Sequence, residues 1–307
     1  MSNLKGISFK GHSELITTIA VTPDGQRVVS GSDDKTIKVW DLNNGVLLHS
    51  LEGHKDSVQA LSVAPNSHIV VSGSKDKTIK IWDLDSGKLL HSLEGVTGSV
   101  CAVAVTPDGH QIVSGDMVDK KLKVWNLENG KLLYSFEGYT QGVYAVVVTP
   151  DGRKVVSGSF DKTLVWDLVS GKLVYSLEGH SLLNCSIVVT PDSRNIASAG
   201  RLDHIINVWD LESGKLLRSL EGNISGISAM AVTPDSRKVV YCGGVFRYSM
   251  KVLDLENGKI LGSIKERWGN IVSLVVNPNG QQVIFSLEQE YAGGKSQHSI
   301  RMLDIKF

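Results

Sequence analysis

Histidine, serine and aspartate recur together in this sequence, and these three residue types in one site can form the catalytic triad of a hydrolase. Three such sets each end in tryptophan: His12, Ser30, Asp34 and Trp40; His54, Ser72, Asp76 and Trp82; His180, Ser198, Asp203 and Trp209. A catalytic site needs to exist only once, whereas these sets repeat at matching positions. We therefore interpret them as structural, because a buried imidazole, carboxylate, hydroxyl and indole N–H can satisfy one another's hydrogen-bonding groups.

The cysteines and the remaining potentially catalytic residues do not form recognisable catalytic or metal-binding motifs. The three cysteines, Cys101, Cys185 and Cys242, form neither an even disulfide framework nor a metal-like spacing. The sequence has no His-Glu-x-x-His, Cys-x-x-Cys, phosphate-binding loop or Gly-x-Ser-x-Gly motif. We therefore predict no catalytic residue, no metal site and no cofactor.

Tryptophan marks an internal repeat that must position these side chains. It occurs at Trp40, Trp82, Trp125, Trp166 and Trp209, at steps of 42, 43, 41 and 43 residues. Each is followed by Asp or Asn and then Leu, and the series continues at Leu253 and Leu303 with steps of 44 and 50 residues. The sequence therefore consists of seven phased units, which is typical of a repeat architecture.

Each unit contains four short runs that favour β-strands. In the second unit they are roughly residues 58–64, 69–72, 78–83 and 88–94, separated by turn sequences such as APNS and DSG. The first two runs are apolar on both faces, as strands packed between neighbouring sheets are. The fourth run carries Ser, His and Lys, as an exposed outer strand does. No segment shows sustained helical periodicity.

The two ends of the chain complement each other. The last unit stops at IRMLDIKF and lacks the outer strand that closes every other unit. Near the start, ISFKGH at residues 7–12 aligns with HSLEGH at residues 49–54. We therefore predict that the N-terminal segment supplies the outer strand of the seventh unit, which removes an exposed sheet edge.

A period of 40 to 45 residues with a Gly-His opening and a Trp-Asp close resembles the WD-repeat (WD40) family of β-propellers. The resemblance implies an all-β fold, a seven-bladed propeller of four-stranded antiparallel blades, that spans residues 1–307 as one domain. It also implies that the sets of His, Ser, Asp and Trp form hydrogen-bonded tetrads. The regular repeats are similar to bacterial, especially cyanobacterial, WD-repeat regions, in which the propeller acts as a sensor or scaffold.

Four units depart from the tetrad pattern. The replacements are Val96 in unit 3, Tyr139 in unit 4, Asn223, Tyr241 and Leu253 in unit 6, and Arg267 and Leu303 in unit 7. We expect these blades to be held more by apolar packing and by their neighbours in the ring.

By the same resemblance, the loops between strands b and c and between strands d and a lie on one face, the top. The b–c loops vary from SDDK to SLEQEYAGGKSQH, whereas bottom loops such as TPDG and ENG are nearly uniform. Loops on a rigid scaffold usually carry binding residues, so we favour function over drift in loops that tolerate insertion. The predicted partner-binding residues are Tyr139, Tyr144, Phe160, Leu183, Leu202, Arg247, Tyr248 and Trp268. For Tyr139 an alternative is that it substitutes for the missing tetrad histidine.

Composition limits the partners. The chain has 32 basic and 32 acidic residues and a net charge of +0, which argues against a broad nucleic-acid or anionic-membrane surface. We predict a monomeric, cytoplasmic, non-catalytic scaffold or sensor that binds a protein or peptide. The alternative is a small-ligand-binding or enzymatic propeller with its site at the channel mouth. By alignment this mouth is ringed by residues without clustered acids, bases or metal ligands, namely Thr17, Gln59, Cys101, Tyr144, Cys185, Ser228 and Val272.

Overall fold

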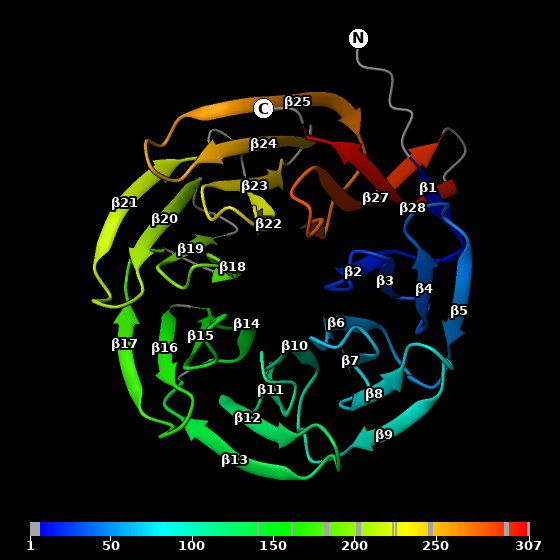
Figure 1. Cartoon of the computed structure of the whole chain (residues 1–307), viewed down its shortest axis with the longest axis horizontal. Helices are drawn as coiled ribbons and strands as arrows, with labels where there is room; N and C mark the ends of the chain where they lie inside the picture. Colours follow the sequence, from blue (N-terminus) through cyan, green and yellow to red (C-terminus); the bar gives the residue numbers. More distant parts are fainter. Residues whose placement is uncertain are drawn as a thin grey trace.

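Seven four-stranded antiparallel sheets radiate as blades from a common axis (Figure 1). The computed structural model describes residues 7–139, 141–160, 162–180, 184–200, 204–222, 224, 226–244, 248–291 and 295–305. Every regular element in these residues is a β-strand, and none of them contains a helix long and apolar enough to cross a membrane. The predicted all-β, seven-bladed propeller is confirmed.

In the first four blades, strands a to d follow one another along the chain. Blade 1 contains β2 (Ile16–Val21), β3 (Arg27–Ser32), β4 (Ile37–Asp41) and β5 (Leu47–Leu51). Blade 2 contains β6 (Val58–Val63), β7 (Ile69–Ser74), β8 (Ile79–Asp83) and β9 (Leu89–Leu93). Blade 3 contains β10 (Val100–Val105), β11 (Gln111–Asp116), β12 (Lys121–Asn126) and β13 (Leu132–Glu137). Blade 4 contains β14 (Val143–Val148), β15 (Lys154–Ser159), β16 (Thr163–Asp167) and β17 (Leu173–Leu177).

The last three blades keep this order but change strand lengths and, at the end, chain connectivity. Blade 5 contains β18 (Asn184–Val189), β19 (Asn195–Gly200), β20 (Ile205–Asp210) and β21 (Leu216–Glu221). Blade 6 contains β22 (Ile227–Val232), β23 (Lys238–Gly243), β24 (Tyr248–Asp254) and β25 (Ile260–Trp268). Blade 7 contains β26 (Leu274–Val276), β27 (Gln282–Tyr291), β28 (Lys295–Asp304) and β1 (Ser8–Lys10).

Strand b of each blade is buried on both faces, as its apolar sequence predicts, whereas strand a keeps several half-buried residues. Strand β7, with sequence IVVSGS, is buried at every position after the first, whereas β9, with sequence LLHSL, is largely exposed. Glycine in strand b lets the next blade approach, because a Cβ on Gly73 would lie 2.5 Å from Val100 Cγ1. Gly31 and Gly115 lie equally close to Val58 and Val143 of the next blades. Adjacent blades therefore pack with almost no space between them.

The uniform a–b turns of the bottom face have a packing cause. In blade 4 the Thr149 hydroxyl donates to Asp151 at 2.5 Å and accepts the N–H of Lys154 at 2.9 Å. Where serine stands in the glycine position it has a positive φ, and its hydroxyl bonds the preceding blade: Ser193 Oγ accepts the Asp151 N–H at 3.2 Å. The same contact joins Asp24 to Ser67 and Asp192 to Ser236. Uniformity of this face therefore reflects turn formation and contact between blades.

Strand β1 closes the ring, as predicted. It pairs antiparallel with β28, with Phe9 opposite Ile300, and Figure 1 shows the two strands side by side where the first and last blades meet. The Phe9 ring is fully buried and lies edge-on to Trp40 of blade 1, with the ring centroids 6.0 Å apart. Phe9 thus joins the outer strand of blade 7 to the core of blade 1.

Replacing Phe9 tests this closure. We expect Phe9→Ala to lower the free energy of unfolding by about 3–5 kcal/mol, the usual cost of truncating a buried phenylalanine. Lys10→Ala on the same strand is the control, because the Lys10 side chain is exposed and its loss should change stability little. Urea denaturation of both variants measures the difference; equal stability of the two would contradict closure through Phe9.

Candidate functional site

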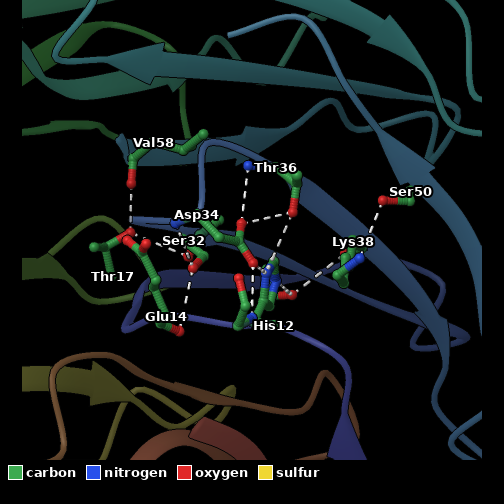
Figure 2. A network of polar contacts seen from close by, with 12 residues as sticks. His12, Glu14, Thr17, Ser32, Asp34, Thr36, Lys38, Ser50 and Val58 are labelled. Atoms are coloured by element: carbon green, nitrogen blue, oxygen red, sulfur yellow. Dashed lines mark hydrogen bonds and ion pairs between the residues drawn. The ribbon is translucent and has the colours of Figure 1, made fainter. Parts of the chain in front are cut away.

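The first predicted tetrad forms a continuous hydrogen-bonded network. His12 Nδ1 lies 2.8 Å from Asp34 Oδ2, and His12 Nε2 lies 2.8 Å from Ser30 Oγ. The indole N–H of Trp40 donates to Ser30 Oγ at 3.0 Å. Figure 2 shows Thr36 beside the same carboxylate, to which its hydroxyl donates at 2.7 Å. An ionised carboxylate only accepts, so Nδ1 of the histidine carries the proton.

Two further tetrads follow this geometry as far as the described residues reach. In blade 2, His54 lies 2.8 Å from Asp76 and 2.7 Å from Ser72, which accepts the Trp82 indole N–H at 2.8 Å. In blade 5, His180 Nε2 lies 2.8 Å from Ser198 Oγ, and Trp209 donates to the same hydroxyl at 2.9 Å. Asp203 lies outside the described residues.

These networks have the composition of a hydrolase triad but not its accessibility. Ser30 and Ser72 are fully buried, and each hydroxyl already accepts an indole N–H. A substrate carbonyl therefore has no path to the serine oxygen. Burial by itself raises the pKa of Asp34, but hydrogen bonds from His12 and Thr36 outweigh it and hold the pKa of that carboxyl well below its usual range. The hydrogen bonds to the ionised Asp34 carboxylate therefore stabilise the blade and do not activate Ser30 for a reaction.

Tyr139 belongs to the interior of blade 4, which corrects its prediction as an exposed partner-binding residue. The side chain is only 8% exposed. Its hydroxyl contacts Ser157 Oγ and accepts the Trp166 indole N–H at 2.7 Å. Burial raises the pKa of this hydroxyl, so it stays neutral. Tyr139 thus occupies the place of the missing histidine, which was the alternative interpretation of the sequence.

Blades 3 and 6 replace the histidine differently. In blade 3 Val96 is buried in the cluster that contains Trp125, and Lys123 reaches the Gly95 carbonyl at 2.7 Å and the Asp119 carboxylate. In blade 6 the Tyr241 hydroxyl donates to the Gly222 carbonyl at 2.8 Å. Apolar packing and long polar side chains therefore take over the role of the tetrad.

The predicted mouth residues coincide with β-bulges. The a–b register shifts around one residue in each of blades 1 to 6, and these residues are Thr17, Gln59, Cys101, Tyr144, Cys185 and Ser228. Two of the hydroxyls bond the next blade: Thr17 donates to the Val58 carbonyl and Ser228 to the Ile271 carbonyl, the latter at 2.9 Å. Among the described residues no three His, Cys, Asp or Glu side chains group as a metal site.

The most exposed apolar feature of the described top face is the b–c loop of blade 3. Met117 and Val118 are 46% and 60% exposed. The Asp116 carboxylate stands where blades 1, 2 and 4 have serine, is buried, and accepts the N–H groups of Val118 and Asp119 at 2.7 and 2.6 Å. We name Met117 and Val118 the blade-3 knob. The sequence showed that this loop was irregular but not that Asp116 fixes its shape.

Two glycines allow the blade-3 knob to lie against its neighbours. A Cβ on Gly142 of blade 4 would lie 2.4 Å from the Met117 carbonyl oxygen, and a Cβ on Gly98 would lie 2.7 Å from Val118 Cγ2. Gly142 is two residues before Tyr144. Tyr144 and Phe160 of blade 4 are both half-buried. The loop is therefore held rigidly against the blade that carries the two predicted aromatic residues.

The other predicted partner-binding residues lie wholly or partly outside the described part of the chain. Leu183, Leu202 and Arg247 lie outside the described residues. Tyr248 and Trp268 face each other across β24 and β25, but their side chains are outside the described part of the chain. Their role stays a prediction.

A cavity of about 430 Å³ opens at the bottom, where blades 7 and 1 meet. Its polar lining is mainly carboxamide, and those side chains already serve local structure: Asn277 donates to Gln282 at 3.2 Å and Asn279 accepts the Gln281 N–H at 2.8 Å. The lining contains no histidine, cysteine or lysine. Its one carboxylate, that of Asp24, already accepts hydrogen bonds from the Thr22 hydroxyl and the Gln26 N–H within the a–b turn.

Comparison with known proteins agrees with this architecture. The chain matches the family described as "WD domain, G-beta repeat" over more than half of its length, at residues 5–41, 45–83, 87–126, 130–167 and 171–210. Each match ends with the third strand of one of blades 1 to 5.

The similarity to curated relatives extends over a much smaller part of the chain. The chain is similar to the "Ribosome biogenesis protein BOP1 homolog" of Drosophila ananassae, Drosophila grimshawi and Drosophila willistoni, each 37% identical over 49 residues. That stretch is 16% of this chain and only 6% of each relative. These insect proteins lend no support to the expected bacterial resemblance.

The tetrads predict a pH dependence. Burial by itself raises the pKa of Asp76, but hydrogen bonds from His54, Thr78 and the Lys55 N–H outweigh it, so the folded-state pKa lies well below the usual value. Stability from this carboxylate is therefore present above about pH 4 and is lost as pH falls below it. We expect urea denaturation to show Asp76→Asn less stable than wild type at neutral pH, with the gap narrowing toward about pH 3. A gap independent of pH would contradict this assignment.

Tyr139→Phe tests the substituted tetrad. Removing the hydroxyl leaves the Trp166 indole N–H with only the longer bond to Ser157, at 3.2 Å, and should cost about 1–2 kcal/mol of stability. Tyr144→Phe is the matched control, because its hydroxyl has no hydrogen bond among the described residues. The melting temperature should be lower for Tyr139→Phe than for Tyr144→Phe. Equal melting temperatures would contradict a stabilising role of the Tyr139 hydroxyl.

Proposed function

This chain belongs to the WD40 repeat family of β-propellers, and from that premise we propose that it is a non-catalytic scaffold or sensor that binds a protein or peptide on its top face. The observation that carries the proposal is the blade-3 knob, two exposed apolar side chains on a loop fixed by the buried Asp116. A rigid loop binds with a smaller loss of conformational entropy than a flexible one.

The proposed docking sector spans blades 3 and 4. It consists of the blade-3 knob with Tyr144 and Phe160, and the backbone contact between Met117 and Gly142 links its two halves. Aromatic side chains and methionine are enriched at protein interfaces. An apolar segment of a partner fits this sector, and the charged loops of blades 1 and 2 would set its orientation.

The alternative, an enzymatic or small-ligand site at the channel mouth, has less support. Of its bulge residues, Thr17 and Ser228 use their hydroxyls to bond neighbouring blades. The buried serines of the tetrads are likewise occupied. The neutral net charge of the chain also favours a protein partner over nucleic acid or an anionic membrane.

The name of the fruit-fly relatives refers to ribosome biogenesis, but the shared stretch is only 49 residues, little more than one repeat. That similarity supports a common repeat rather than a common process. We further propose that residues 1–307 act as one monomeric propeller domain in the cytoplasm.

Paired substitutions in the docking sector test the proposal. We expect Tyr144→Ala with Phe160→Ser, and separately Met117→Ser with Val118→Ser, each to reduce partner capture at least tenfold, because truncating an interface hot spot costs about 2 kcal/mol or more. Pull-down from native cell extract, with bound proteins quantified by mass spectrometry, measures capture. Circular dichroism should be unchanged.

Val169 provides the control, because it is 87% exposed in a bottom turn of blade 4. Val169→Ser removes an exposed apolar side chain from the same blade but the opposite face, and capture should persist. If Val169→Ser abolishes capture and the two top-face pairs do not, the binding face is the bottom.

A further inference from the structure

Blade 7 differs from every other blade in the length of its middle strands. Strands β27 and β28 pair without interruption from Gln282 opposite Asp304 to Tyr291 opposite Lys295. The b–c strand pairs of blades 1 to 5 each extend over only five residue pairs. The blade-7 hairpin therefore extends past the top ends of the other blades.

The outer strand of blade 7 does not follow this extension. Strand β1 ends at Lys10, opposite Ser299, and the chain then leaves because His12 is bonded to Ser30 and Asp34 of blade 1. Blade 6 also has a lengthened third strand, but there the outer strand is lengthened with it, so that Tyr248 lies opposite Trp268. Among the described residues, no strand pairs with the outer side of residues 295–298 in blade 7, and we call this stretch the open edge.

The hydrogen-bonding groups of the open edge can be assigned from the strand register. The N–H groups of Ser286 and Glu288 point away from β28, to the carbonyls of Ser273 and Asn270. Along a strand, the backbone hydrogen-bonding groups of successive residues point to opposite sides. The backbone groups of Leu287 and Gln289 therefore point toward β28, where they lie opposite Ser299 and Gln297. The backbone groups of Ser296 and His298 must then face outward, where the described residues provide no backbone partner.

Unsatisfied polar side-chain atoms also occur on the two outer strands of blade 7. Five buried polar side-chain atoms lack a partner within the described residues, and three of them belong to β1 and β28: Ser8 Oγ, His298 Nδ1 and Arg301 Nε. Two features that often block a sheet edge are absent here, since residues 282–304 contain no proline and the β27–β28 register has no bulge. An exposed, unblocked edge is a template for another strand.

We propose that the open edge binds an extended, proline-free segment of a partner protein as an added antiparallel strand, in line with β1. The main-chain groups of Ser296 and His298 supply the recognition, and a proline at the matching position of the segment would remove the donor they need. This inference rests on the proposed function, because the open edge projects from the top face, but it needs neither Tyr144 nor Phe160.

The test uses random short peptides displayed on phage, selected against the full chain. Enriched peptides are synthesised, and their dissociation constants are measured by calorimetry for wild type, Ser296→Pro and Ser296→Thr. Proline at 296 removes only an outward N–H and is tolerated at such edge positions, whereas threonine keeps the N–H and is the matched control. We expect a peptide class that loses about tenfold in affinity with Ser296→Pro and keeps it with Ser296→Thr.

A second measurement is independent of any change in the variant's fold. The same peptides, N-methylated at alternate residues, should no longer bind wild type, and the unmodified peptides should slow amide exchange at Ser296 and His298. If every enriched peptide binds Ser296→Pro as wild type, or if none is enriched, the open edge is not a strand-binding site. If the wild type instead dimerises in sedimentation equilibrium and Ser296→Pro does not, the edge takes a second copy, and the proposal of a partner segment fails.

The failures of the two proposals are distinguishable. Loss of peptide binding with Tyr144→Ala and Phe160→Ser, but not with Ser296→Pro, would leave the docking sector standing and remove the open edge. The opposite pattern would retain strand addition and move the apolar docking site elsewhere.

Discussion

The propeller depends on one constraint, which is that the two middle strands of its blades are buried on both faces. A blade can bury its apolar surface only between two other blades, so the ring must close for any blade to be stable. Glycines such as Gly73 permit the close approach, because a Cβ there would collide with Val100 of the next blade. Closure depends on a three-residue strand, β1, and on the packing of Phe9 against Trp40.

The tetrads show how burial decides the chemistry of a residue set. Ser30, His12 and Asp34 are arranged as in a hydrolase, with hydrogen bonds of 2.8 Å at both ring nitrogens. Because the serine is inaccessible and already bonded to an indole, the same groups stabilise the blade. Blade 4 reaches an equivalent result with Tyr139, whose single hydroxyl joins Trp166 to Ser157. Different residue types can therefore form the hydrogen-bonded network that holds the tryptophan indole in the blade.

The irregular parts of the repeat that carry our proposals have a fixed shape. The blade-3 knob is shaped by the buried carboxylate of Asp116 and by close contact with Gly142. The open edge of blade 7 exists because His12 draws the outer strand away while β28 continues. The uniform bottom turns follow the opposite principle, since their hydroxyls and backbone groups are used between blades. Polar backbone groups that are free to bind a partner are therefore found on the top face rather than in the bottom turns.

The sequence by itself determined the seven units, the four strands of each, the tetrad members of blades 1 and 2, and closure by residues 7–12. These features depend on the repeat period and on the residues of local turns, both of which can be read directly from the sequence. Only the tertiary structure decided that Tyr139 points inward, that Asp116 caps its loop and that β28 continues past the end of β1, which lies opposite Ser299. Each of these depends on what lies against a residue from a distant part of the chain, and burial by a neighbouring blade leaves no local signature in the sequence.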